Sequence, residues 1–155
     1  MFEKARGTKG ALPCGMTPQE LRDRTKKFAI EIVRLCHKLP DFWDVRELGK
    51  QFLRSGTAVA ANYRAAQRAR SDKEFCSKIG LVVEEADETQ LWIELLPEAY
   101  PELDKRLHKE LLGEAAELSA IFTASHRTAK ANLEKRKQDK KNERAKKMAR
   151  PKISD

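Results

Sequence analysis

SDKEFCSKIGLVVEEADETQLWIELL, residues 71–96, is the stretch that decides the fold. Apolar and small residues recur in it at alternating steps of four and three, which is the spacing of one face of an α-helix. The stripe consists of Phe75, Ile79, Val82, Ala86, Thr89, Ile93 and Leu96. Ser71 followed by Glu74 is a capping box that predicts the start of the helix, and Pro97 is expected to stop it.

Three further segments show the same helical period. One covers residues 17–39 and opens with a capping box at Thr17 and Glu20, one begins at Asp44, and one runs from about 101 to 133. No stretch alternates with period two for long enough to predict a sheet. Four amphipathic segments joined by short loops predict an all-α fold, an antiparallel up-down four-helix bundle over residues 17–133.

The three stripes are Leu21, Phe28, Ile32, Leu35 and Leu39; Val45, Leu48, Phe52, Ser55, Val59, Asn62 and Ala66; and Leu103, Leu107, Leu111, Ala115, Leu118, Phe122, Ser125 and Ala129. Ser55 and Asn62 are polar members of a stripe that should be buried, so each needs a hydrogen-bond partner. That partner could lie on a neighbouring helix of the bundle or across a subunit interface. The small residues 56–61 likewise permit close approach by a helix of the same chain or of another subunit.

The formal net charge of +8 is unevenly distributed along the chain. Residues 1–70 carry 15 Lys/Arg and 7 Asp/Glu, residues 71–126 carry 5 and 13, and residues 127–155 carry 12 and 4. The opposed blocks predict complementary faces that meet inside a bundle, between protomers, or with a nucleic acid on the basic pair of helices. Residues 1–16 are expected to form a flexible basic arm, and residues 134–155 a basic tail that is an extended helix or disordered.

The composition also excludes several classes of protein. No apolar run approaches the roughly 18 residues that a membrane span needs, and the N-terminus has no apolar segment typical of a secretion signal. The three cysteines are far apart and are expected to be reduced thiols, which predicts a cytoplasmic protein without membrane association.

Catalytic and metal chemistry find little support in the sequence. The three histidines have no partner at ligand spacing, so no metal and no cofactor is expected. Glu84 and Glu88 share a helix face and could hold a hydrated Mg²⁺, as a hydrolase or nuclease would require. We favour a solvated or salt-bridged flank for this pair, because two carboxylates alone seldom form a dedicated site. The protein is therefore predicted not to be an enzyme.

The candidate nucleic-acid contacts are basic side chains in two groups. Eight belong to the tail: Lys135, Arg136, Lys137, Lys140, Lys141, Arg144, Lys146 and Lys147. The second group, Arg64, Arg68 and Arg70, ends the second helical segment. Positive charge at a helix C-terminus also favours the helix dipole, so Arg68 and Arg70 have a structural explanation as well.

Two motifs carry a resemblance to a known family. Residues 53–66, LRSGTAVAANYRAA, followed by EFCSKIG at 74–80 and EEADETQLW at 84–92, resemble the bacterial four-helix-bundle proteins encoded within intervening sequences of large-subunit ribosomal RNA genes. The resemblance covers about residues 18–131. It implies an antiparallel bundle that assembles into a ring-like homopentamer. The chain is also similar to the accessory protein of diversity-generating retroelements, which implies nucleic acid and a reverse transcriptase as partners.

These observations favour a non-enzymatic, oligomeric nucleic-acid-binding or adaptor protein, with RNA as the expected nucleic acid. A structural scaffold that mediates only protein–protein contacts is the alternative. Phosphate contacts by Lys and Arg would give sequence-independent affinity with a steep salt dependence. Repetition of the tail in an oligomer would add avidity.

Overall fold

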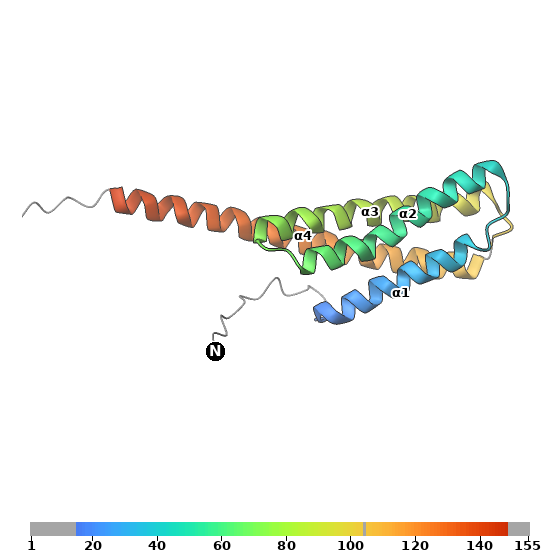
Figure 1. Cartoon of the computed structure of the whole chain (residues 1–155), viewed down its shortest axis with the longest axis horizontal. Helices are drawn as coiled ribbons and strands as arrows, with labels where there is room; N and C mark the ends of the chain where they lie inside the picture. The colour runs from blue at the N-terminus through green and yellow to red at the C-terminus, as the bar shows by residue number, and fades with distance from the viewer. Residues whose placement is uncertain (1–14, 104, 149–155) are drawn as a thin grey trace, which may run out of the picture.

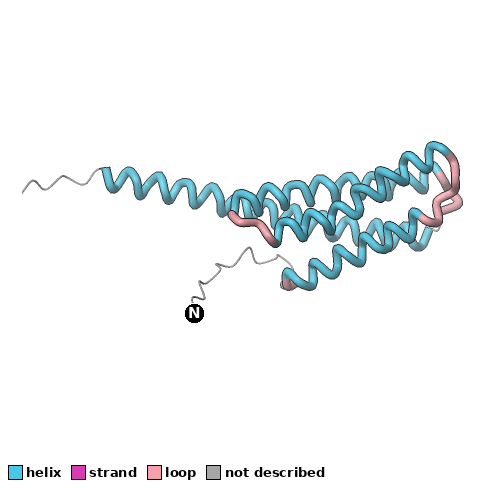
Figure 2. The backbone as a smooth tube through the Cα atoms, viewed as in Figure 1, coloured by secondary structure: helices cyan, strands magenta, loops and turns pink. Residues whose placement is uncertain are grey.

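The computed structural model of the chain describes residues 15–103 and 105–148, which form four helices (Figure 1). They are α1 (Pro18–Cys36), α2 (Trp43–Gln67), α3 (Asp72–Ala99) and α4 (Lys105–Met148). Each helix packs against the next, and α4 returns more sparsely against α1. The described part of the chain contains no strand, and its loops gather at the two ends of the bundle (Figure 2). The predicted all-α four-helix bundle is confirmed.

The start of α1 forms as its sequence predicts. The Thr17 hydroxyl accepts the backbone N–H of Glu20 at 3.2 Å, and the Glu20 carboxylate accepts the N–H of Thr17 at 2.7 Å. This reciprocal pair satisfies two donors that have no partner within the helix. The same hydrogen bond from Thr17 lowers the pKa of Glu20 below its usual value.

The start of α3 differs in one contact. Ser71 accepts the N–H of Glu74 at 3.1 Å, but the Glu74 carboxylate accepts the backbone N–H of Arg70, at 2.9 Å, instead of that of Ser71. The box therefore extends one residue into the preceding turn. The bond from Arg70 lowers the pKa of Glu74.

Pro97 does not stop α3, which continues to Ala99. A proline has no N–H to donate, so the carbonyl of Ile93, four residues earlier, loses its helical partner. The ring nitrogen Nε2 of His108 on α4 lies 2.5 Å from that carbonyl oxygen. The prediction of a stop was wrong because a side chain from the next helix replaces the lost donor.

The remaining helix ends deviate by a few residues. α1 ends at Cys36 rather than Leu39, and α4 begins at Lys105 after a turn through residues 101–103. α2 begins at Trp43 without a side-chain cap. Asp44, the expected first residue, accepts the hydroxyl of Tyr100 at 2.6 Å, and this bond raises the pKa of Tyr100 to about 12.

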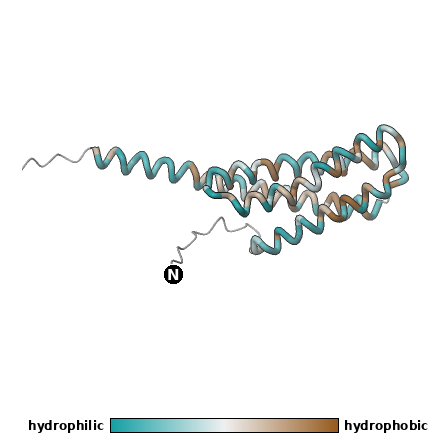
Figure 3. Tube along the Cα trace, in the orientation of Figure 1, coloured by the Kyte–Doolittle hydropathy of each residue, from teal (hydrophilic) through white to brown (hydrophobic). Residues whose placement is uncertain are grey.

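The core lies along the predicted stripes. In α3 every stripe residue from Ile79 to Leu96 is buried, while Phe75 is half-buried. In α4 the buried stretch ends at Phe122, and the apolar colour of Figure 3 fades along the part of α4 that leaves the bundle. The stripes omitted buried Thr25, Gly49, Gly56, Tyr63, Cys76 and Ile121.

Two alternatives left open by the sequence are resolved for Ser55 and Gly56. The hydroxyls of Ser55 on α2 and Thr89 on α3 lie 3.0 Å apart, and both residues are fully buried. Gly56 faces Ile32 on α1, whose Cδ1 would lie 2.3 Å from a Cβ added at the glycine. Both residues thus serve contacts between helices of one chain, whereas Asn62 is half-buried.

Some predictions fall on residues that the structure does not describe. The predicted arm 1–16 lies outside the described residues except for Gly15 and Met16, and Met16 packs against the core. The last seven residues of the predicted tail, 149–155, also lie outside them. Among the described helices, none is long and apolar enough to cross a membrane.

Candidate nucleic-acid interface

α4 continues as a helix well beyond the bundle. Residues 134–148 are helical and every one of them is exposed. Figure 1 shows this stretch projecting from one end of the molecule. Lysine, arginine, glutamine, glutamate and alanine dominate it, and these residues have high intrinsic helix propensity. All eight candidate tail contacts therefore lie on one solvated helix; we call residues 134–148 the projecting helix.

The second group of candidates lies at the end of α2. Arg64 is in its last turn, Arg68 is its C-cap residue, and Arg70 follows in the turn to α3. All three are exposed. The Nε of Arg70 lies 3.3 Å from the Glu74 carboxylate, yet its side chain remains 91 % exposed. These three cations are accessible to a large anionic ligand.

The structure brings the two groups to the same end of the bundle. An ion pair joins Arg136 of the projecting helix to Asp72, the first residue of α3 and two residues after Arg70. Gln67 donates to the carbonyl of Pro18 at 2.9 Å, which places the start of α1 at this end too. We call this the tail end of the bundle.

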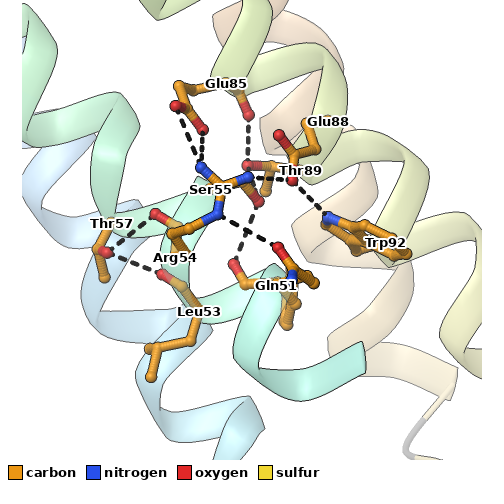
Figure 4. A network of polar contacts seen from close by, with 10 residues as sticks. Gln51, Leu53, Arg54, Ser55, Thr57, Glu85, Glu88, Thr89 and Trp92 are labelled. Atoms are coloured by element: carbon orange, nitrogen blue, oxygen red, sulfur yellow. Dashed lines mark hydrogen bonds and ion pairs between the residues drawn. The ribbon is translucent and has the colours of Figure 1, made fainter. Parts of the chain in front are cut away.

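The acidic cluster on α3 has a partner within the chain. Figure 4 shows Arg54 of α2 between the carboxylates of Glu85 and Glu88. Glu88 also accepts the indole N–H of Trp92 at 3.3 Å. The contact with Arg54 lowers the pKa of Glu88 and raises that of Arg54. Glu88 is thus compensated by a protein cation, as the salt-bridged interpretation of this cluster predicts.

A second cluster joins α1 to α4. The guanidinium of Arg24 donates to Glu114 through Nε at 2.6 Å and through Nη2 at 2.7 Å, and it also reaches Glu117 at 2.5 Å. The bonds to Glu114 are the main cause of the raised pKa of Arg24. A hollow of about 490 Å³ between the two helices begins beside this pair, with Phe28 and Leu111 in its lining. The basic and acidic blocks of the sequence therefore meet inside the bundle at these two clusters.

Metal chemistry gains no support from the described residues. They contain no group of three or more His, Cys, Asp or Glu side chains placed to hold a metal ion. Cys36 is half-buried, and burial raises the pKa of its thiol to about 11.

Sequence reasoning missed Asp72, the residue that links the projecting helix to the bundle. Its place in the first turn of α3 was explained by the capping motif. The pairing of residue 72 with residue 136 depends on the register of two helices, and no local pattern encodes it.

The comparisons with known proteins agree with this fold. A family model described as 23S rRNA-intervening sequence protein matches residues 19–124. A crystal structure of a protein with unknown function from the S23 ribosomal protein family of Bacteroides thetaiotaomicron has a TM-score of 0.64 and 28 % sequence identity, and covers 72 % of this chain and 99 % of that chain. Curated proteins yielded no match. Since the family model spans the helices from α1 into α4 and more than half of the residues, the chain belongs to the 23S rRNA-intervening sequence protein family.

Proposed function

We propose that the protein is a non-enzymatic, oligomeric RNA-binding adaptor that acts in the cytoplasm. The observation that supports this most directly is the convergence of two basic groups at the tail end, where the projecting helix leaves the bundle beside Arg68 and Arg70. The family name, which refers to ribosomal RNA, favours RNA over other polyanions.

Binding of this kind is dominated by phosphate contacts. The described tail, residues 134–148, has no aromatic side chain on which a base could stack. Lysine and arginine side chains release counterions when they approach phosphates, so affinity should fall steeply with salt and depend little on sequence.

The proposed assembly is a ring-like homopentamer, as the family resemblance implies. Large apolar side chains remain exposed on the single chain, including Leu81 at 45 % and Leu91 at 50 % on α3. Apolar groups gathered on a surface are typical of protein–protein contacts. An oligomer would present several projecting helices, and their avidity would strengthen weak single contacts. A reverse transcriptase as the protein partner stays a prediction from the resemblance to retroelement accessory proteins.

Filter binding of a labelled RNA at several salt concentrations tests the proposal. The full-length chain is compared with a full-length variant in which the eight tail candidates are replaced by glutamine. We expect the variant to bind at least about a hundredfold more weakly near 0.1 M salt and to show a shallower salt dependence, since most of the phosphate contacts are gone.

Circular dichroism provides the control, because glutamine has a helix propensity close to that of lysine and arginine. A variant that keeps both the affinity and the salt slope contradicts the role of the tail. No RNA binding by either protein at low salt contradicts the proposal as a whole and favours the structural scaffold.

A further inference from the structure

The cations of the projecting helix are not evenly distributed around its axis. At 100° per residue, 18 residues make five complete turns of an α-helix. Arg136 lies 18 residues after Leu118, and Lys140 lies 18 residues after Phe122. Leu118 and Phe122 are fully buried in the core. The direction that points into the core within the bundle is therefore occupied by cations once the helix has left it.

The ion pair of Arg136 confirms this direction independently. Its guanidinium contacts Asp72 at the start of α3, which is the side on which the bundle lies. Lys140, Arg144 and Lys147 continue from Arg136 at steps of four, four and three and so share its face. We call these three residues the inner face. They are exposed, and the face they form turns toward the same side of α4 as the bundle axis.

The other side of the projecting helix has a different charge balance. Lys135 and Lys146 lie five and six residues from Lys140, which places them about 140° and 120° away around the helix. Each has an acidic neighbour at helical contact spacing: Asp139 four residues after Lys135, and Glu143 three residues before Lys146. The positive potential of these two lysines is therefore partly compensated within the helix.

We infer that the projecting helix binds the phosphate backbone of double-helical RNA through its inner face, with the RNA lying in the corner between this helix and the tail end of the bundle. This inference rests on the proposed function and narrows its contact set to one side of the helix. Arg68 and Arg70 extend the positive surface at the foot of the corner. A duplex fits this surface better than a single strand, since it has the higher phosphate density and needs no stacking partner.

The test compares two pairs of lysines that differ only in their side of the helix. Full-length Lys140→Gln/Lys147→Gln and full-length Lys135→Gln/Lys146→Gln lose the same charge at exposed helical positions. The probe is a labelled 20-base-pair RNA duplex, titrated by filter binding between about 50 and 200 mM salt. Circular dichroism checks that both variants keep the helix content of the parent.

The inner-face pair should weaken duplex binding at least about tenfold near 0.1 M salt and reduce the log–log salt slope by about 2, because two phosphate contacts are lost. The control pair should weaken binding less than about threefold, since its charges are beyond direct contact and screened by salt. Equal losses in the two pairs overturn the inner-face inference. A single strand of the same sequence that binds as tightly as the duplex overturns the choice of duplex RNA.

The variant with all eight glutamines separates this inference from the proposed function. If it binds like the parent, the tail is not the contact and the proposed function fails with it. If it loses binding while the two lysine pairs remain equal, the tail binds RNA without a preferred face and only the inference fails.

Discussion

Single polar side chains join the helices of this bundle at places where the helices themselves leave a backbone or side-chain group without a partner. His108 is the clearest case, because its ring nitrogen reaches the Ile93 carbonyl that Pro97 has deprived of a donor. Tyr100 and Asp44 form a similar link between the end of α3 and the start of α2. A buried acceptor without a donor costs free energy of desolvation, so such links stabilise the fold beyond their own hydrogen bond.

A double-mutant cycle at Pro97 and His108 measures this effect. His108→Ala should lower the free energy of unfolding by about 1–3 kcal/mol, because the Ile93 carbonyl loses its remaining donor. In the Pro97→Ala background the backbone N–H of residue 97 can satisfy that carbonyl, so the same histidine substitution should cost clearly less. Chemical denaturation of the four proteins gives the coupling. Equal costs in both backgrounds would show that His108 contributes through packing alone.

At the scale of helices, the close approach of α1 and α2 depends on Gly56. A Cβ at this position would lie 2.3 Å from Cδ1 and 3.1 Å from Cγ2 of Ile32. Such distances require the helices or the isoleucine to move. The run of small residues from 56 to 61 is thus explained, at its first position, by a contact inside the chain.

Gly56→Ala should destabilise the protein although alanine is the better helix former. Overpacking costs about 1–3 kcal/mol, against a gain of about 1 kcal/mol in helix propensity. Ile32→Val removes Cδ1, so the double variant should recover part of the loss, which thermal or urea unfolding will measure. Gly113→Ala is the matched control: nothing lies within 4 Å of its added Cβ, so it should stabilise α4. A stabilised Gly56→Ala variant would disprove the steric argument.

At the scale of the whole molecule, charge is separated by function. Arg24 and Arg54 compensate acidic residues of α4 and α3 within the bundle, and the cations of the projecting helix remain exposed at one end. Exposed leucines on α3 form a different surface from this basic end. One chain can therefore assemble with copies of itself through the bundle and leave the projecting helix accessible to RNA.

Light scattering tests the proposed assembly. The parent should have a mass about five times that of the 17.7 kDa chain. Leu81→Gln/Leu91→Gln should lower this mass, because it places polar groups in the surface that we expect to be covered. Met148→Gln, at an exposed apolar residue of the projecting helix, should leave the mass unchanged. A monomeric parent would contradict the pentamer.

The sequence by itself determined the four helices, their antiparallel order and most of their buried faces, because helical period, capping residues and short connections are local properties of the chain. It also identified both basic groups, although it could not place them relative to one another. Only the tertiary structure decided that His108 permits α3 to pass Pro97, that Ser55 pairs with Thr89, and that Arg136 meets Asp72. Each of these contacts joins residues at least 11 positions apart, so the packing register of the helices, and no local pattern, determines it.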